Sequence, residues 1–231
     1  MLKPGESSAS EPAARRSGAV WRKLRYVWLK GRYDSFGQLL LDGFNLVGLD
    51  VNPYRLYLEG LPLLGRDMEA QAPRFEQYSF KLLQRADIPF IASLPDRKFT
   101  AESLLRRLDL NCIGLGAWLG DDLAAFVWCD LKNCHYKGHR FALKADEGYL
   151  FDVYALRPFR GKGLAPQLRW RIYVELARMG RTTLYSISHS FNGPAVQVKK
   201  KLNAQILDSG ITIGIFRRWR FSRHIKGYRL T

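Results

Sequence analysis

Cysteine is scarce in this 231-residue chain, which contains three, at positions 112, 129 and 134. A small and odd number of cysteines argues against a disulfide framework and fits free thiols in a reducing compartment. Long apolar runs are also missing, so the sequence predicts no transmembrane helix. Residues 1–18 lack the apolar core of a secretory signal and are typical of a flexible tail. We therefore expect a cytoplasmic protein.

Acidic side chains are in short supply as well, with 21 against 37 lysines and arginines, which gives a net charge of +16. Such a surplus indicates an anionic partner, and nucleic acid, an anionic membrane surface or a phosphorylated substrate would each satisfy it. Apolar side chains, in contrast, are plentiful: 47% of the residues are hydrophobic and 13% are aromatic. This content is enough for a packed core and excludes a disordered chain.

From residue 75 onward the sequence predicts a mixture of strands and helices. We expect helices at 100–108, 164–179 and 194–202, and strands at 78–83, 112–119, 123–131, 148–156, 182–188, 205–216 and 221–230. Thr100 is a natural N-cap, Gly120-Asp121-Asp122 a hairpin turn and Gly180 a helix stop. The predicted fold class is α/β (α+β), a mixed central sheet flanked by helices.

The N-terminal part of the chain has a weaker pattern. Two tryptophans and a leucine fall at helical spacing within 20–30, whereas residues 35–64 are apolar but repeatedly broken by glycine and proline. We expect residues 19–74 to form a mostly helical or irregular extension that packs on a domain spanning residues 75–231. The helix at 20–30 could instead lie on anionic lipid, which would place the protein peripherally at a membrane.

The most informative segment is Arg160-Gly161-Lys162-Gly163-Leu164-Ala165, which joins an expected strand to an expected helix. Its two glycines allow positive φ, so successive backbone N–H groups and the positive end of the helix can converge on one anion. Arg160 and Lys162 add positive charge. The arrangement predicts a pyrophosphate site. A Rossmann dinucleotide site fits less well, because the third glycine is missing.

The loop resembles the acyl-CoA-binding motif of the GNAT superfamily, R/Q-x-x-G-x-G/A, through Arg160, Gly163 and Ala165. Asn192 and the helix after it resemble a second segment of that family at the right separation. The resemblance covers residues 75–231. It implies a GNAT-like fold and direct attack of an amine on the thioester of acetyl-CoA, without a metal. It also implies that the loop and Asn192 bind the cofactor, and that backbone N–H groups in the segment Ala155, Leu156 and Arg157 contact the thioester carbonyl.

The sequence departs from the family at the residues that move protons. The tyrosine that frequently acts as the acid is replaced by Lys199, which either donates a proton to the leaving thiolate or contacts a CoA phosphate from an exposed position. For the base, Asp152 is the first choice because its strand runs beside the expected thioester. It could equally be a structural or substrate-binding carboxylate. His189, after the next strand, is the second choice, and Glu147 and Tyr154 are also candidates.

Two other groupings suggest different chemistry. Cys129, Cys134, His135 and His139 have the ligand types of a zinc site, but adjacent residues of a strand point to opposite faces, and we expect no metal. Arginines alternate with aromatic residues over 216–229, a pattern shared by nucleic-acid binding and by a closing hairpin. We expect the hairpin, and therefore no nucleic-acid partner.

The sequence thus predicts an N-acyltransferase that moves acetyl from acetyl-CoA to a small-molecule primary amine, and the basic surface favours an anionic acceptor. Two alternatives stay open. One is transfer of a long acyl chain from acyl-carrier protein or acyl-CoA near a membrane. The other is a non-catalytic basic binding module on the same fold. The sequence gives neither the acceptor's identity nor the oligomeric state.

Overall fold

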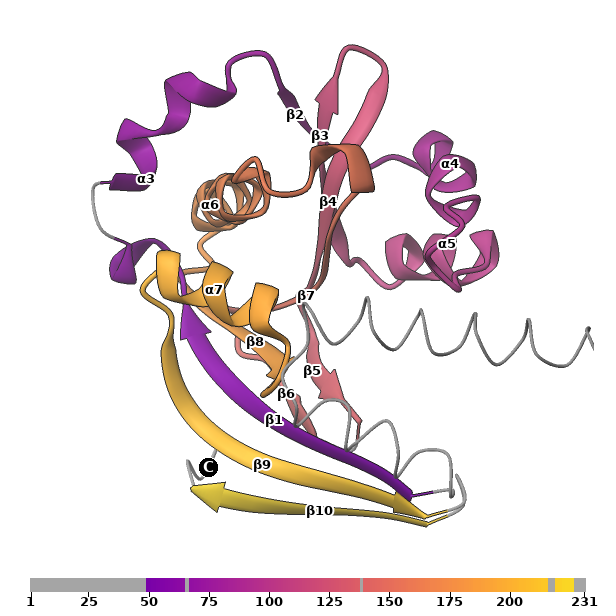
Figure 1. The fold of residues 1–231 in the computed structure, drawn as a ribbon, viewed down its shortest axis with the longest axis vertical. Helices are drawn as coiled ribbons and strands as arrows, with labels where there is room; N and C mark the ends of the chain where they lie inside the picture. Colours follow the sequence, from indigo (N-terminus) through magenta and orange to yellow (C-terminus); the bar gives the residue numbers. More distant parts are fainter. Residues whose placement is uncertain (1–48, 65–66, 138, 216–218, 227–231) are drawn as a thin grey trace, which may run out of the picture.

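The computed structural model describes residues 49–64, 67–137, 139–215 and 219–226. The expected tail at 1–18 and the expected helix at 20–30 lie outside these residues. Within them the chain forms an eight-stranded sheet with helices on both faces and a separate two-stranded ribbon (Figure 1). This is the predicted mixed α/β architecture. No helix in the described ranges has the length and apolar character needed to cross a membrane.

The predicted strands and helices from β2 onward are present in the predicted order, and α4, β5 and β6 are additional elements that the sequence did not predict. The strands are β1 (Leu49–Glu59), β2 (Ser79–Leu82), β3 (Ile113–Leu119), β4 (Asp122–Asp130), β5 (Asn133–Tyr136), β6 (His139–Ala142), β7 (Glu147–Ala155), β8 (Thr183–His189), β9 (Gln205–Ile215) and β10 (Trp219–Lys226). The helices are α3 (Asp67–Ala70), α4 (Ile88–Ala92), α5 (Ala101–Asp109), α6 (Leu164–Arg178) and α7 (Gly193–Lys201). Short 3-10 turns lie at Leu61–Leu63, Ala72–Phe75, Arg85–Asp87 and Arg157–Phe159.

The sheet has the order β10-β9-β1-β8-β7-β4-β3-β2. Strands β7 and β8 pair in parallel, and the other neighbours in this order pair antiparallel. The small ribbon consists of β5 and β6. The one parallel pair, β8 and β7, therefore lies near the middle of the sheet.

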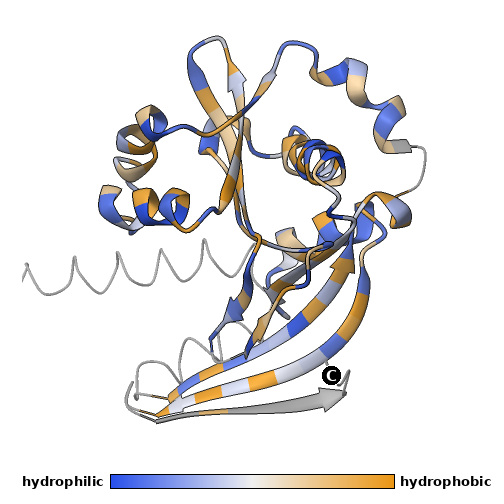
Figure 2. Cartoon of the chain, turned by 180° about the vertical axis from the view of Figure 1, so that it is seen from behind, coloured by the Kyte–Doolittle hydropathy of each residue, from blue (hydrophilic) through white to orange (hydrophobic). Residues whose placement is uncertain are grey.

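Strand β1 is the main difference from the sequence prediction. Residues 49–59, expected in a mostly helical or irregular extension, instead form a strand between β8 and β9. Buried and half-buried residues alternate along much of it, and Figure 2 shows the matching alternation of hydropathy along β1 and β9. Pro53 argued against an inner strand, because proline lacks the N–H that a neighbouring strand needs. Here the Pro53 carbonyl accepts a hydrogen bond from Ser190, just past the end of β8, so no β8 residue faces the missing N–H.

Each face of the sheet buries its own hydrophobic cluster. Helix α6 covers one face with residues such as Leu164 and Leu168, which pack with Leu150 of β7. Helices α4 and α5 cover the opposite face, where Leu104 packs with Trp128 of β4. Figure 1 shows α6 and the α4–α5 pair on the two sides of the strands. The sheet is therefore the middle of three layers, and its inner strands are buried on both faces: every residue of β4 after Asp122 is buried.

The helix ends obey the local signals in the sequence. The Thr100 hydroxyl accepts a hydrogen bond from the Ser103 N–H at 3.1 Å, as predicted for the N-cap of α5. Asn192 caps α7 in the same way through the Ala195 N–H at 3.2 Å. Gly180 follows α6 with φ of 77°, which is the left-handed conformation expected of a helix stop.

Candidate functional site

Strands β7 and β8 begin as a parallel pair and then separate. Their last paired residues are Leu150 and Ser186. Beyond this point β7 continues to Ala155 along β4, while β8 continues to His189 along β1. Burial changes at the same place, since the first four residues of β7 are buried and the last five are half-buried. The carboxyl ends of the two strands therefore diverge, and such a crevice is where open α/β sheets bind ligands.

The glycine loop lies directly after β7, at this divergence. Gly161 and Gly163 have φ of 78° and 79°, and Gly163 is the left-handed residue that precedes α6. A Cβ on Gly161 would meet nothing within 4 Å, and a Cβ on Gly163 would lie 3.5 Å from the Phe75 ring. The positive φ predicted from the sequence is confirmed. Glycine is required by the backbone conformation and not by crowding.

The N–H groups of this loop are available to an anion. Among the described residues, the backbone N–H groups of Gly161, Lys162 and Gly163 donate no hydrogen bond. They precede the positive end of α6, a helix of 15 residues. The Arg160 Nε donates to the carbonyl of Ala155 at 3.0 Å, which fixes a positive charge beside the loop. The loop thus has the geometry of a phosphate or pyrophosphate site.

Lys199 lies buried where β7 and β8 separate. Its Nζ donates a hydrogen bond to the hydroxyl of Ser186, the last β8 residue of the parallel ladder. It also donates to the Glu59 carboxylate, at 2.8 Å. Because Lys199 is only 5% exposed, it is not the exposed lysine that the sequence allowed as a CoA phosphate contact. Its ammonium group instead lies at the apex of the divergence.

Three donors share the buried carboxylate of Glu59, at the end of β1. Arg169 and Tyr173 of α6 donate to it together with Lys199. Two cations therefore face one carboxylate. Burial would raise the pKa of Glu59, but Arg169 and Lys199 hold it well below its usual value. The cluster thus keeps an ionised carboxylate at zero exposure, with one positive charge in excess.

The excess positive charge lowers the pKa of Lys199 and not that of Arg169. Burial would lower the pKa of Arg169, but the attraction of Glu59 raises it above the usual range. Burial, followed by repulsion from Arg169, lowers the pKa of Lys199 to about 7, although Glu59 opposes the shift. Arg169 is therefore the permanent partner of the carboxylate. Lys199 can release or take up a proton near neutral pH.

Asp152 lies on the separated half of β7 and contacts α5, on the face opposite α6. It has φ of 53° inside a strand, at a position where the pairing with β4 shifts register. Its carboxylate forms ion pairs with Arg97 and Arg107, the latter at 2.7 Å. Taking up a proton would weaken both ion pairs. The geometry therefore favours the structural or substrate-binding role of Asp152 over its role as the base.

The other candidate bases differ in position. His189 ends β8 on its separated half, and its Nδ1 accepts a hydrogen bond from the backbone N–H two residues on, at 3.2 Å. Tyr154 is on the separated half of β7, and its hydroxyl donates to Asp96 at 3.3 Å. Glu147 begins β7, at the end far from the divergence, and accepts a hydrogen bond from Tyr185. The structure thus brings His189, Tyr154 and Asp152 to the crevice and leaves Glu147 outside it.

Part of the segment predicted to contact a thioester carbonyl already forms hydrogen bonds within the protein. The Leu156 N–H donates to the carbonyl of Ala124 at 2.9 Å, so it is bound within the sheet. The Arg157 side chain forms two hydrogen bonds with Asp96, each of 2.6 Å. Arg157 donates no backbone hydrogen bond among the described residues, which leaves its N–H as the better placed of these two donors.

Several residues of the buried cluster were missed from the sequence. Glu59 lies in a segment with no predicted element, and Arg169, Tyr173 and Ser186 lay within an expected helix or strand without a motif. The sequence offered one signal for this cluster. Arg169 directly follows Leu168 of the apolar stripe of α6, and a solvated arginine is not expected beside that stripe. Its partner could not be found, because Glu59 is far from it in sequence.

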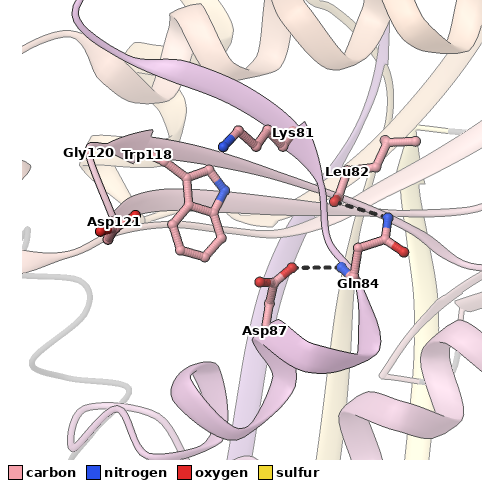
Figure 3. A pocket seen from close by; sticks show the side chains of 7 residues that line it. All are labelled: Lys81, Leu82, Gln84, Asp87, Trp118, Gly120 and Asp121. Carbon is pink, nitrogen blue, oxygen red and sulfur yellow. Dashed lines mark hydrogen bonds between the residues drawn. The ribbon is translucent and has the colours of Figure 1, made fainter.

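A hollow of about 560 Å³ lies away from this site, at the sheet edge formed by β2 and β3 (Figure 3). Its lining residues are Lys81, Leu82, Gln84, Asp87, Trp118, Gly120 and Asp121. None of the predicted site residues is among them. As for metal ligands, nowhere in the described ranges do three or more His, Cys, Asp or Glu side chains gather around one point.

Solved structures that share this arrangement of helices and strands include the following three. A GCN5-related N-acetyltransferase-like protein from Streptococcus suis aligns with a TM-score of 0.53 and 12% identity, over 78% of this chain and 68% of that one. A GNAT-family acetyltransferase from Colwellia psychrerythraea aligns with a TM-score of 0.52 and 14% identity, over 72% and 57%. A GCN5-related glucosamine N-acetyltransferase region of a fungal β-N-acetylglucosaminidase aligns with 0.52 and 13%, over 83% and 23%. No protein-family model and no curated protein sequence matches the chain.

The structure therefore defines an α/β protein in which a glycine loop with unbonded N–H groups lies where two parallel strands diverge. Its fold is that of the GNAT acetyltransferases, as the sequence resemblance implied. Identities of 12–14% show the fold and not the activity. This chain also spans only 23% to 68% of the lengths of the three structures.

Proposed function

We propose that the chain is an acyl-CoA-dependent N-acyltransferase that transfers acetyl from acetyl-CoA to a primary amine. The observation that carries the proposal is the loop at Gly161–Gly163, whose unbonded N–H groups precede α6 at the mouth of the crevice. A pyrophosphate fits such a loop. The crevice between β7 and β8 then offers an extended cofactor arm a path from the loop to Lys199 at the apex.

The reaction needs few groups from the protein. The amine nitrogen forms a bond to the acyl carbon and the carbon–sulfur bond breaks, while the amine loses a proton and the sulfur gains one. Residues 160–165 would hold the pyrophosphate of acetyl-CoA, which supplies the activated thioester. The Arg157 N–H is proposed as a donor to the carbonyl oxygen, where negative charge develops in the transition state. His189, at the end of β8, becomes the first candidate for the proton acceptor in place of Asp152.

Lys199 is proposed to protonate the leaving sulfur. The buried ammonium at the apex and its pKa of about 7 support this role, since about half of such groups carry the proton at neutral pH and release it readily. Below pH 7 the group is charged and can donate. As pH rises through about 7 it becomes neutral, so the acid contribution to kcat should decline. A Lys199→Met variant should lack this decline and lose about 10²-fold in kcat.

The loop assignment is tested with two matched glycine variants. Gly163→Val should abolish CoA binding in a calorimetric titration, because valine disfavours the left-handed backbone that aims the loop N–H groups. Gly180→Val is the control: this residue has φ of 77°, nothing lies within 4 Å of its Cβ position, and it ends the same helix. Both substitutions strain the backbone similarly, but only Gly163 is in the loop. A folded Gly163→Val protein that binds CoA normally would contradict the proposal.

Catalysis is tested separately from binding. Wild-type protein with acetyl-CoA and a panel of primary amines should release free thiol in an amine-dependent manner. CoA binding without thiol release for any amine would support the alternative of a non-catalytic binding module. Turnover restricted to long-chain acyl donors would support the alternative of a long-chain acyltransferase.

A further inference from the structure

Four arginines gather beside the separated half of β7, on the face that α4 and α5 cover in Figure 1. They are Arg97, Arg107, Arg157 and Arg160. The loop between α4 and α5 is tied down there, since Arg97 pairs with Asp152 and Asp96 pairs with Arg157. The arginines therefore lie along the crevice in which transfer is proposed, on the face opposite the α6 layer.

This group is short of negative charge. Within the described ranges, the ion pairs of these arginines involve two carboxylates, those of Asp96 and Asp152, against four guanidinium groups. Burial lowers the pKa of Arg107 to about 10, and the neighbouring charge of Arg97 also lowers it. The Arg97 Nε is buried and has no hydrogen-bond partner in the described structure. An additional anion at the solvent-facing N–H groups of the two arginines would offset the repulsion between them.

Arg97 and Arg107 are held rigidly by aromatic rings. Both guanidinium groups lie 4.6 Å from the centre of the Phe99 ring. Arg97 also lies over Tyr154, at 4.9 Å, and Arg107 over Trp128, at 5.2 Å. Stacking of this kind fixes the plane of each guanidinium and lowers the entropic cost of binding a ligand.

The pair is also reachable. The side chains of Arg97 and Arg107 are 25% and 19% exposed, whereas that of Asp152 between them is 8% exposed. The carboxylate is therefore buried behind two guanidinium groups that still meet solvent. Each guanidinium has five N–H donors, and Asp152 can occupy only some of them.

We propose that Arg97 and Arg107 bind an oxyanion group, a carboxylate or a phosphate, on the amine that accepts the acyl group. The acceptor would then be an anionic amine, such as an amino acid or a phosphorylated amine. Two planar guanidinium groups match the spacing of oxygens in these groups better than ammonium groups do. Asp152 acts as the positioning residue that holds the two arginines, and its unusual positive φ aims its carboxylate between them. This inference rests on the proposed acyltransferase function.

The first experiment compares acceptors that differ only in their anionic group. Amino acids are paired with their amides, and phosphoethanolamine with ethanolamine. Wild-type kcat/KM should favour the anionic member of at least one pair by about tenfold or more, as expected for a charge-assisted bidentate contact. The pair of acceptors that shows this preference indicates whether the site binds a carboxylate or a phosphate. Arg107→Gln and Arg97→Gln should bring the ratio close to one, because kcat/KM for the anionic member should fall much more than kcat/KM for the neutral member.

Arg171→Gln is the matched control. Arg171 of α6 also stacks on aromatic rings, Phe80 at 5.1 Å and Trp170 at 4.7 Å, and its Nε is also buried without a partner. It packs on the opposite side of the sheet and should keep the wild-type preference. An equal loss in Arg171→Gln and Arg107→Gln would overturn the inference, and so would a wild-type enzyme that turns over neutral amines equally well.

A second measurement tests the anion site without turnover, so that its failure is distinct from failure of the proposed function. Gly163→Val removes the loop as a competing anion site. In this background, inorganic phosphate or acetate should raise the melting temperature, because a ligand that binds the folded state stabilises it. Adding Arg107→Gln should abolish the rise, and adding Arg171→Gln should not. A rise that survives Arg107→Gln, or no rise with either anion, would overturn the site. Loss of CoA affinity in Arg107→Gln alone would assign the pair to the cofactor instead.

Discussion

Lys199 occupies the position at which the GNAT sequence pattern that this chain resembles frequently has a tyrosine. The structure shows how a lysine is accommodated at this buried position. An ammonium group in the interior is costly unless it is paired. Glu59 supplies the pairing, but Arg169 competes for the same carboxylate. The result is a lysine whose pKa of about 7 is far below its usual value. A tyrosine hydroxyl donates a proton because it is a weak acid, and the lowered pKa of this lysine supports the same role in the proposed reaction.

The charge of Lys199 should be visible in stability as a function of pH. The unfolded chain keeps this lysine protonated up to its usual pKa near 10.4, whereas the folded chain releases the proton near pH 7. Between these values the unfolded state binds more protons, so the free energy of unfolding rises with pH. Wild-type protein should therefore gain stability from pH 7 to 9 relative to Lys199→Met, measured by urea unfolding.

Glu59→Gln serves as the contrasting variant. Lys199→Met leaves Glu59 paired one-to-one with Arg169, so the protein should remain folded at pH 7. Glu59→Gln leaves Arg169 and Lys199 buried without a counter-charge and should cost about 3–5 kcal/mol. If the two variants have parallel pH profiles and equal stabilities, the described charge sharing is incorrect.

Asp152 leads to a second prediction at the scale of one residue. Asp152→Asn removes the charge that Arg97 and Arg107 share, so it should destabilise the fold by about 1–3 kcal/mol. A catalytic base, in contrast, would be expected to lower kcat by about 10²–10⁴-fold without loss of stability. Thermal unfolding together with steady-state kinetics separates the two. Unchanged stability with a large loss of kcat would restore Asp152 as the base.

Helix α5 carries Arg107, so the end of this helix matters to the arginine pair. Thr100→Ala removes the side-chain oxygen that accepts the Ser103 N–H and should cost about 1 kcal/mol of stability. Thr100→Ser keeps the oxygen and should cost much less. Chemical unfolding of the two variants checks the prediction. Similar losses for both would mean that the methyl group, and not the cap, stabilises the helix.

The elements that were predicted correctly are those whose signal is local. α6 shows its apolar stripe and its glycine stop within its own residues, and the turn at Gly120 identifies the hairpin of β3 and β4. The glycine loop was recognised for the same reason, since its conformation depends on neighbours in sequence. Strand β1 lacked such a signal. It is stabilised by pairing with β8 and β9, which begin far along the chain at Thr183 and Gln205.

The residues of the candidate site also divide into those with a local sequence signal and those placed by long-range contacts. Positions that depend on the backbone of one loop could be predicted, whereas charge pairs between distant elements could not. Arg97 and Arg107 meet Asp152 only because α5 folds over β7. Lys199 meets Glu59 only because β1 enters the sheet beside β8. For this reason the sequence left Asp152 open between a base and a structural or substrate-binding carboxylate, and Lys199 open between a proton donor and an exposed phosphate contact.

At the scale of the whole molecule, β1 makes the N-terminal part of the chain necessary for the sheet. Deletion of residues 1–60 should prevent folding, because β8 and β9 would each lose their shared neighbour and Lys199 its carboxylate. Deletion of residues 1–18 is the control and should leave the unfolding transition unchanged. Circular dichroism and thermal melts of both truncated proteins provide the measurement. A cooperative transition in the longer deletion would show that residues 61–231 fold on their own.

The position of β1 also determines when the protein can fold during synthesis. This strand leaves the ribosome before its partners exist, and at about 5–20 residues per second roughly ten seconds pass before β8 and β9 follow. Until then the backbone donors and acceptors of β1 are open to water or to other chains. Lys199, which pairs with Glu59 in the folded protein, has not yet been synthesised. Closing contacts between such distant segments is slow. Assembly of the proposed catalytic crevice is therefore expected to be a late, post-translational event, and the nascent chain a natural client for a chaperone that shields unpaired strands.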